Sequence, residues 1–376
     1  MKRSFYVPFV LLVAAFTFGS FVGCSKDESP TAPPKAEPSL WSQLGSGTNA
    51  VVWALTVYDG KLIAGGVFTE AGGNPVTYLA AWDGTSWSAL GAGFGGPQNP
   101  FVVALATYDN KLIAGGDFTS AGGAAANHIA AWDGASWSPL GAGVGAGDYQ
   151  GADLLVVHNG KLIVGGGFDV AGGVDANQIA AWDGTLWSRL GTGGLADDLM
   201  QVNALAVCGG QLIISGDFRD VYDQIVYGVA RWNGSSWDPL GSAMNDRVWA
   251  ITEFNGQLIA GGEFTAVGST PANHVAVWNG SSWATMGAGF DDDVDALAVF
   301  NNQLIAAGEF TASGSVPAKA IAAWNGTSWA AINGELQSSY SPSVSVLGIY
   351  NSKLIVGGVF DTAGGITVNN IAAWGN

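Results

Sequence analysis

The chain has 376 residues and a formal net charge of −17, from 13 Lys and Arg against 30 Asp and Glu. Nucleic-acid binding depends on a basic surface, so this charge balance argues against nucleic acid as a partner. The 57 glycines follow no collagen-like period and accompany 16 tryptophans. Such a composition is typical of many short strands joined by tight turns.

The chain begins with a predicted export signal. A basic Lys2-Arg3 pair precedes an apolar run over residues 5–21, and the run ends in FVGC, whose last residue is Cys24. A basic start, an apolar stretch and small residues before a cut are typical of a signal peptide. The FVGC stretch resembles a bacterial lipobox, in which the Cys becomes the lipidated first residue, although Phe21 replaces the usual Leu. The alternatives are a plain signal peptide or an uncleaved anchor, because the run approaches the ~20 residues that span a bilayer.

A polar, Pro-rich segment follows Cys24, with the sequence SKDESPTAPPKAEPS. Such a segment cannot bury a core. We therefore expect residues 1–23 to form a lipoprotein signal peptide and residues 24–38 a lipidated Cys with a flexible tether. By resemblance to lipoprotein sorting rules, Ser25 implies the outer membrane, and residues 26–28 (KDE) resemble the surface-export tags of Bacteroidota-type lipoproteins. The expected location is the outer membrane, facing the periplasm or the cell surface, with membrane contact only through the lipid.

A repeat fills residues 39–376. The tryptophan that ends an IAAW-like segment recurs every 46 or 50 residues, at Trp82, Trp132, Trp182, Trp232, Trp278, Trp324 and Trp374. Periods of this size are typical of propeller blades or solenoid turns. Each copy contains four predicted strands, like VVALATY (102–108), KLIAGGDF (111–118), HIAAW (128–132) and SWSPLG (136–141). Asp-Gly and Asn-Gly pairs between them are typical of tight hairpins.

The last copy stops at IAAWGN and has no fourth strand of its own. The segment SLWSQLG (39–45) precedes the first full copy and matches SSWDPLG (235–241). We therefore expect the N-terminal segment to pair beside residues 371–374, which removes two exposed edges. A solenoid would need capping repeats, and the sequence has none. The predicted fold is an all-β, seven-bladed β-propeller of four-stranded antiparallel blades, closed by its N-terminal strand and monomeric.

The blades resemble kelch repeats. KLIAGG resembles the kelch second strand with its Gly-Gly doublet, and the tryptophans of AAWDG and ASWSPLG resemble the later strands in their spacing. Trp replaces the usual Tyr in the third strand, and the doublet becomes Ser215-Gly216 and Ala307-Gly308. A WD40 interpretation is less favoured, because Gly-His pairs are missing and later copies read Trp-Asn. Kelch-fold galactose oxidase raises the question of a copper radical site, but Cys208 falls at a hairpin away from the variable loops.

Residues that repeat in every copy are expected to pack, because every blade must bury its own core. This applies to the fourteen tryptophans of the third and fourth strands, to the glycine doublets and to the Phe after each doublet. Only the connection from a fourth strand to the next first strand varies in length. It is expected to share a face with the second-to-third connections, and loops on a rigid scaffold are where binding usually resides.

One position at the start of the first strand does not repeat. It reads Trp53, Val103, Asp153, Asn203, Trp249, Asp295 and Ser345. Two aromatic and several polar side chains around one opening suit a sugar, through stacking and hydrogen bonds. The predicted ligand-binding residues at this channel mouth are Trp53, Asp153, Asn203, Trp249 and Asp295. The alternative is that these side chains only fill or solvate the channel.

Metal and catalytic signatures are sparse. The run Asp291, Asp292 and Asp293 could hold Ca²⁺, which takes about six to eight oxygen ligands. It lacks the spacing of a calcium loop, so a solvated acidic loop is the favoured interpretation and no cofactor is expected. The three histidines of the chain assemble into neither a Ser-His-Asp set nor a metal site.

The sequence therefore predicts a non-catalytic binding module of the cell envelope. Its expected ligand is a glycan or an envelope or extracellular protein, bound at the acidic face with the variable loops. One alternative is a carbohydrate-active enzyme, a polysaccharide lyase or hydrolase that uses acidic residues at the channel mouth. The other is a structural component of an envelope complex. If Cys24 is lipidated, Cys208 has no partner for a disulfide, so stability must come from packing.

Overall fold

The computed structural model describes residues 40–96, 99–145, 151–191, 199–219 and 225–375. The predicted signal peptide, the lipidated Cys24 and the tether lie outside these residues. All regular elements in the described part are β-strands. Among the same residues, no helix has the length and apolar character needed to span a membrane.

The described residues form seven four-stranded antiparallel sheets. We number them 1 to 7 along the chain and give the strands of each from its innermost strand outward. They are sheet 1, β2 (Val52–Tyr58), β3 (Lys61–Gly66), β6 (Leu79–Trp82) and β7 (Trp87–Ser88); sheet 2, β9 (Phe101–Tyr108), β10 (Lys111–Asp117), β13 (Ile129–Trp132) and β14 (Trp137–Pro139); sheet 3, β16 (Leu154–His158), β17 (Lys161–Gly165), β20 (Ile179–Trp182) and β21 (Trp187–Arg189); sheet 4, β22 (Leu199–Cys208), β23 (Gln211–Arg219), β24 (Ile225–Trp232) and β25 (Trp237–Pro239); sheet 5, β26 (Val248–Phe254), β27 (Gln257–Gly262), β30 (Val275–Trp278) and β31 (Trp283–Thr285); sheet 6, β32 (Val294–Phe300), β33 (Gln303–Gly308), β36 (Ile321–Trp324) and β37 (Trp329–Ala331); and sheet 7, β39 (Ser343–Tyr350), β40 (Lys353–Val359), β43 (Ile371–Trp374) and β1 (Trp41–Gln43).

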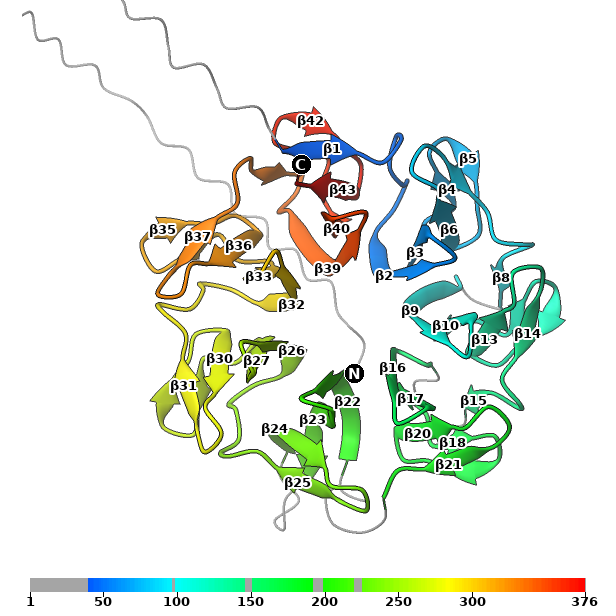
Figure 1. Cartoon of the computed structure of the whole chain (residues 1–376), viewed down its shortest axis with the longest axis horizontal. Helices are drawn as coiled ribbons and strands as arrows, with labels where there is room; N and C mark the ends of the chain where they lie inside the picture. The colour runs from blue at the N-terminus through cyan, green and yellow to red at the C-terminus, as the bar shows by residue number, and fades with distance from the viewer. Residues whose placement is uncertain (1–39, 97–98, 146–150, 192–198, 220–224, 376) are drawn as a thin grey trace, which may run out of the picture. The chain divides into compact units, whose positions relative to one another are not determined.

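The sheets lie around a common centre, each with its innermost strand toward that centre (Figure 1). Each innermost strand contacts the innermost strand of the next sheet, and β39 of sheet 7 contacts β2 of sheet 1. Every four-stranded sheet stays open, with two edges of its own. Radial repetition of four-stranded antiparallel sheets is the architecture of a β-propeller.

The N-terminal strand β1 occupies the outer place in sheet 7. It pairs antiparallel with β43, with Trp41 opposite Trp374. The Trp41 side chain is 5% exposed, and its Nε1 donates hydrogen bonds to the carbonyl oxygens of Asn333 at 3.0 Å and Gly334 at 2.9 Å. These carbonyls follow the last strand of sheet 6, so a residue near the start of the chain joins its two final sheets.

The repeated aromatic residues form the cores between the sheets. All seven fourth-strand tryptophans are buried, with exposed fractions from 1% at Trp329 to 7% at Trp187, and the Phe after each glycine doublet is buried in every sheet. The predicted packing role is confirmed for both sets. The third-strand tryptophans lie at the margin of these cores: Trp82 and Trp182 are 8% exposed, whereas Trp132 and the others are half-buried.

The two glycines of each doublet have different steric roles, as Gly65 and Gly66 of sheet 1 illustrate. A Cβ on Gly65 would lie 2.7 Å from a methyl group of Val102 in the next sheet, so this glycine allows neighbouring sheets to approach, as predicted. A Cβ on Gly66 would lie 2.1 Å from the carbonyl oxygen of Val51, the residue just before the adjoining strand β2. The second glycine therefore accommodates an irregularity at the start of the innermost strand.

The Trp-Asp pairs owe their aspartate to a turn between the third and fourth strands. Asp83 accepts hydrogen bonds at 2.8 Å from the backbone N–H groups of Thr85 and Ser86. The Thr85 side chain and these backbone donors hold the pKa of Asp83 well below its usual range. Asn279 makes the same turn with Ser281 and Ser282, so Asp and Asn are interchangeable here because the turn requires only an acceptor oxygen.

Candidate binding site at the channel mouth

The position that does not repeat is the extra residue of a β-bulge. The register between β2 and β3 shifts between Val52 and Ala54, which leaves Trp53 without a partner on β3. The same shift occurs at Val103, Asn203, Trp249, Asp295 and Ser345. In sheet 3, Asp153 precedes the innermost strand. A bulge redirects one side chain without disturbing the rest of the ladder, which explains why this position accepts such different residues.

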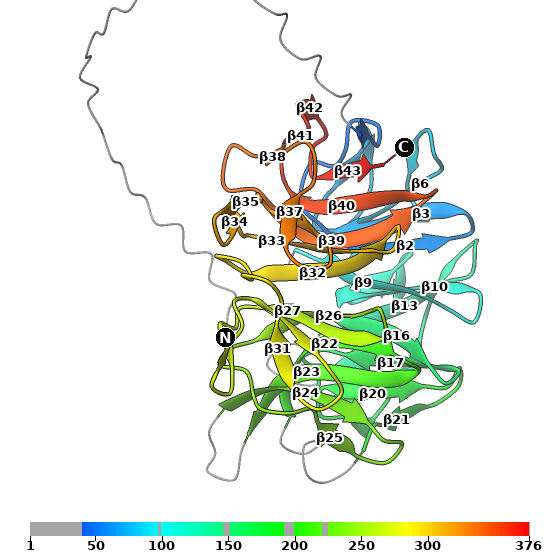
Figure 2. The same ribbon diagram turned by 60° about the vertical axis from the view of Figure 1, so that its left-hand side comes forward.

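The bulges lie at the same end of the sheets as the variable connections. Short strands from these connections pair with the second-to-third hairpin of the next sheet: β8 (Phe94–Gly95) with β11 (Ser120–Ala121), β15 (Val144–Gly145) with β18 (Val170–Ala171), and β38 (Leu336–Gln337) with β41 (Thr362–Ala363). The predicted shared face is therefore confirmed, and we call it the loop face. The other short strands of this face are β4 (Glu70–Ala71), β5 (Asn74–Pro75), β12 (Ala124–Ala125), β19 (Val174–Asp175), β28 (Ala266–Val267), β29 (Thr270–Pro271), β34 (Ala312–Ser313), β35 (Val316–Pro317) and β42 (Ile366–Thr367). Figure 2 shows β34, β35, β38 and β41 gathered beyond one end of the long strands.

A partly buried network connects sheets 4 and 5 at the bulge ends of their innermost strands, the end that we call the channel mouth. The Asn203 side chain is 7% exposed and Asp217 is 4% exposed. Asn203 Nδ2 donates to Asp217 Oδ1 at 2.6 Å, and Arg247 donates to Asp217 Oδ2 from Nε at 3.2 Å and from Nη2 at 3.1 Å. The Arg247 guanidinium also lies 5.7 Å from the ring centre of Trp249, whose Nε1 donates to Glu263 Oε1 at 3.0 Å. Two predicted residues, Asn203 and Trp249, are thus linked through an arginine.

Carboxylates crowd the mouth at sheets 5 and 6. Burial raises the pKa of Glu263, and the nearby charges of Asp293 and Asp246 raise it further. Burial also raises the pKa of Glu309, again with help from Asp292 and Asp293. Like charges that share a partly buried site disfavour ionisation, so this side of the mouth is poised to accept a cation.

A histidine supplies part of the compensating charge. His274 Nδ1 lies 3.4 Å from Asp293 Oδ1 and 3.0 Å from the carbonyl oxygen of Gly262. Burial lowers the pKa of His274, but the hydrogen bonds with Asp293 and Gly262 outweigh burial and leave the pKa raised. Protonated His274 therefore offsets only one of the carboxylates beside it.

The mouth is apolar at sheet 1, whereas sheet 2 contributes both Phe101 and Asp117, whose Oδ1 lies 3.6 Å from His128 Nδ1. Trp53 contacts Phe101 edge to face, with ring centres 5.4 Å apart and an interplanar angle of 88°. The sheet 1 residues equivalent to Arg247 and Glu263 are Val51 and Val67. Sheets 5 and 6 therefore present several charged side chains at this end, whereas sheet 1 presents aromatic and aliphatic ones.

The five predicted residues lie on five different sheets. Asn203, Trp249 and Asp295 belong to the consecutive sheets 4, 5 and 6, whereas Trp53 and Asp153 belong to sheets 1 and 3. Asp153 donates its backbone N–H to Gly165 at 2.9 Å. The structure thus groups three of the five on the charged side and places Trp53 on the apolar side.

The structure adds four residues to this site that the sequence did not predict: Asp217, Arg247, Glu263 and Glu309. A signal for three of them was present, because the residue before the repeated Phe does not repeat either. It reads Val67, Asp117, Gly167, Asp217, Glu263, Glu309 and Val359. This position pairs with the residues just before the bulge, as Asp217 does with Gln201, so it borders the same opening.

The calcium candidate has a structural task. Asp291 Oδ1 accepts hydrogen bonds at 2.8 Å from the backbone N–H groups of Thr311 and Ala312. Asn245 holds the corresponding loop of sheet 5 in the same way. Within the described ranges, no three His, Cys, Asp or Glu side chains gather into a group that could hold a metal ion. Asp291 therefore has the same structural role as Asn245, which accepts the equivalent backbone hydrogen bonds in sheet 5.

Cys208 ends the innermost strand of sheet 4, at the opposite end from the bulges. It is a free cysteine. Burial, with a smaller contribution from the charge of Glu253, raises the pKa of its thiol to about 11. Because the thiolate is the reactive form, this cysteine is a poor nucleophile at neutral pH.

One comparison with known protein families supports the β-propeller fold. A family described as a domain of unknown function (DUF5122) beta-propeller matches residues 109–130. Among solved structures, one chain in a mitotic checkpoint complex is 12% identical with a TM-score of 0.50, covering 91% of this chain and 96% of that chain. A computationally designed protein, Ika8, is 12% identical with a TM-score of 0.47, covering 87% and 97%. A Trypanosoma rangeli sialidase in complex with the inhibitor DANA is 11% identical with a TM-score of 0.40, covering 91% and 60%. No curated protein matches the sequence.

Proposed function

We propose that this chain is a seven-bladed, kelch-type β-propeller, lipid-anchored at the outer membrane, that binds a protein or a glycan at the loop face without catalysing a reaction. The contact of β39 with β2 and the pairing of β1 with β43 support a ring completed by the N-terminal strand. The FVGC sequence at residues 21–24 supports the anchor.

The side chains at the channel mouth are the main support for a binding function. Asn203 and Asp217, both buried, and the partly buried Arg247 form a polar network at positions that the repeat leaves free. Packing alone would require the same residues in every sheet. The neighbouring carboxyl groups of Glu263 and Glu309 have raised pKa values, and such perturbed groups cluster at functional sites.

The charge distribution favours a protein over a glycan as the ligand. Glu263 and Glu309 have raised pKa values, to which the charge of Asp293 contributes in both cases, so a cation bound beside these carboxyl groups would stabilise their ionised forms. Trp53 and Phe101, on the other side of the opening, offer an apolar contact. A peptide segment with a Lys or Arg beside an aromatic or aliphatic residue satisfies both sides, and such complementarity supplies specificity and faster association.

A pull-down from a bacterial envelope extract tests this function. The purified protein is used as bait at low and high salt, beside the double variant Glu263→Gln/Glu309→Gln. We expect captured proteins whose recovery falls with salt and with the double variant. A structural component of an envelope complex would retain its partners in the variant, and a glycan ligand would instead appear on a glycan array.

Glu263→Gln is expected to increase the free energy of unfolding at pH 7. A carboxyl group whose pKa is raised by folding binds its proton more tightly in the folded state. The free energy of unfolding therefore falls as the pH rises from the unfolded-state pKa through the folded-state pKa. The glutamine side chain would carry no charge and could still accept the Trp249 hydrogen bond. Urea denaturation at pH 7 and at about pH 3.5 should show a gain that vanishes in acid. Glu70→Gln, at an exposed side chain, is the control, and equal gains for both variants would contradict the argument.

A hydrolase is the second candidate, favoured by the same raised pKa values. A partly buried glutamic acid can serve as the general acid of a glycoside hydrolase, with a second carboxylate roughly 5–10 Å away. Release of reducing sugar from a polysaccharide by the parent protein, lost in Glu263→Gln and Glu309→Gln, would favour this function over simple binding.

Cys24→Ala is expected to leave an unlipidated protein. Without the Cys there is no acceptor for the lipid, so the variant should partition into the aqueous phase of a Triton X-114 extraction, whereas the parent enters the detergent phase. Metabolic labelling with a fatty acid provides a second readout. If the variant still enters the detergent phase, the apolar run of residues 5–21 is a retained anchor instead.

A further inference from the structure

On the face opposite the loops, tyrosines fill the junctions between some sheets. This hairpin face carries the turns between the first and second strands. The hydroxyl of Tyr350 donates to the carbonyl oxygen of Gly60 in sheet 1 at 3.2 Å, and that of Tyr58 donates to Asn110 in sheet 2 at 3.3 Å. Tyr108 reaches sheet 3 in the same way. Each tyrosine ends an innermost strand and closes the gap to the next sheet.

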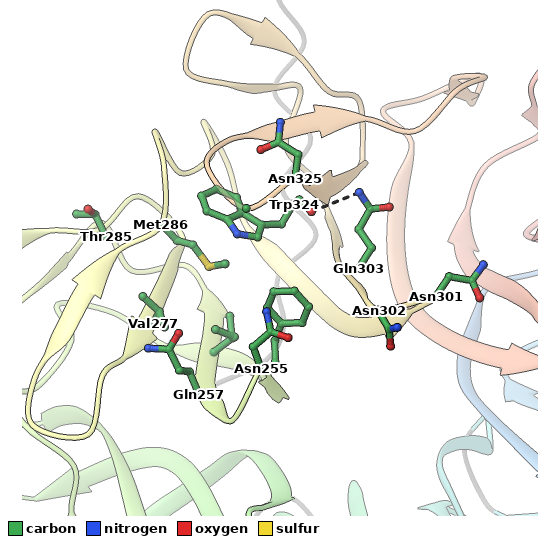
Figure 3. Close-up of a pocket in the computed structure, with 13 residues that line it drawn as sticks. Asn255, Gln257, Val277, Thr285, Met286, Asn301, Asn302, Gln303, Trp324 and Asn325 are labelled. Carbon is green, nitrogen blue, oxygen red and sulfur yellow. Dashed lines mark hydrogen bonds between the residues drawn. The ribbon is translucent and has the colours of Figure 1, made fainter.

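Phe254 takes this position at the junction of sheets 5 and 6. It has no hydroxyl group to reach the next hairpin, and a cleft of about 710 Å³ opens beside it. Figure 3 shows Met286, Val277 and Trp324 around this cleft, with amide side chains on both of its sides. A cleft of this size can accommodate about two sugar rings.

The lining of the cleft contains no ionisable side chain. Six amides contribute, from residues 255, 257, 301, 302, 303 and 325. At two repeat positions of this face, amides replace the charged residues of sheets 1–3. Gln211, Gln257 and Gln303 occupy the position of Lys61, Lys111 and Lys161, and Asn233, Asn279 and Asn325 that of Asp83, Asp133 and Asp183. The turn is kept without the charge, since Asn325 Oδ1 accepts from the N–H groups of Thr327 and Ser328.

Several of these amides have hydrogen-bonding capacity to spare. In the described structure, the side chains of Asn255, Gln257, Asn301 and Asn302 make no hydrogen bond to protein. Gln303 uses only Nε2, which donates to the carbonyl oxygen of Trp324 at 3.3 Å (Figure 3). Each amide pairs a donor with an acceptor, which matches a sugar hydroxyl group, and the half-buried Trp324 and Phe254 offer aromatic surface to the apolar side of a sugar ring.

We propose that the cleft between sheets 5 and 6 binds a neutral saccharide of about two sugar rings. The site lies on the hairpin face and uses none of the residues of the channel mouth. It is therefore independent of the ligand proposed for the loop face.

Phe254→Tyr tests the site by closing it. By the precedent of Tyr58 and Asn110, the new hydroxyl should reach the carbonyl of Asn302 and occupy the cleft without harming the fold. The probes are maltotriose, cellotriose and chitotriose, titrated calorimetrically into the full-length protein, with trigalacturonate as the charged comparison. We expect saturable binding of at least one neutral trisaccharide, weakened at least about tenfold by Phe254→Tyr, and no binding of trigalacturonate.

Two further variants separate filling of the cleft from damage to the fold. Asn302→Gly removes one amide at a position where sheets 1, 3 and 5 carry Gly60, Gly160 and Gly256, so it should weaken binding at unchanged stability. Glu263→Gln, at the channel mouth, should leave saccharide binding unchanged. Failure of all three neutral probes to bind, or binding that neither Phe254→Tyr nor Asn302→Gly weakens, overturns the proposal and leaves the loop-face function untouched.

Discussion

Deletion of residues 39–47 is expected to abolish cooperative unfolding and to make the protein aggregate. The deletion removes β1, which pairs with β43, and the buried side chain of Trp41. Loss of a buried tryptophan alone costs about 3–5 kcal/mol, and the exposed edge of β43 invites pairing with other chains. Thermal unfolding followed by tryptophan fluorescence, with light scattering recorded in parallel, measures both effects.

The matched control is a deletion of equal length over residues 26–34, in the predicted tether. This variant should unfold at the temperature of the parent protein and should scatter no more light. If the deletion of residues 39–47 behaves in the same way, then β1 contributes little to sheet 7, and the ring completed by the N-terminal strand loses its main support.

Trp329→Ala is expected to lower the free energy of unfolding by about 3–5 kcal/mol. The Trp329 side chain is 1% exposed, and its Nε1 donates to the carbonyl oxygen of Met286 at 3.1 Å. It also contacts Phe290 and Trp324, with ring centres 4.9 Å and 5.2 Å away. An alanine here leaves a cavity among aromatic rings that cannot collapse. Urea denaturation measures the loss.

Trp53→Ala should weaken ligand binding more than it lowers the free energy of unfolding. Trp53 is half-buried and occupies a bulge, so its removal should cost at most about 1 kcal/mol of stability. Binding of a ligand captured at the loop face should weaken by about 1–3 kcal/mol, as for an aromatic anchor. Trp249→Ala is the second test, since Trp249 contacts Arg247 and Glu263. Equal loss of stability in Trp53→Ala and Trp329→Ala would show that Trp53 belongs to the core.

The repeat by itself determined the strand pattern, the aromatic cores and the loop face. Every sheet must bury the same kind of surface, so the residues that do this recur at fixed spacing, as Trp87, Trp137 and Phe118 do. The short Asp-Gly and Asn-Gly turns are local too, because positive φ at Asp59 and Asn159 depends on a few neighbouring residues. The repeated core residues and the turn residues can therefore both be predicted from the sequence of a single copy.

The chemistry of the candidate sites was decided only by the tertiary structure. Asn203, Asp217 and Arg247 come from two sheets, and their hydrogen bonds follow from a bulge whose extra residue no local pattern reveals. The cleft beside Phe254 is bounded on its other side by the hairpin of sheet 6, which contains Asn302. Its existence therefore depends on how sheets 5 and 6 are placed against each other. Contacts of this kind depend on how far one sheet is rotated against its neighbour, and close packing of the repeated core sets that rotation. The residues that do not repeat contact one another between neighbouring sheets, and the residue spacing within one copy of the repeat does not predict such contacts.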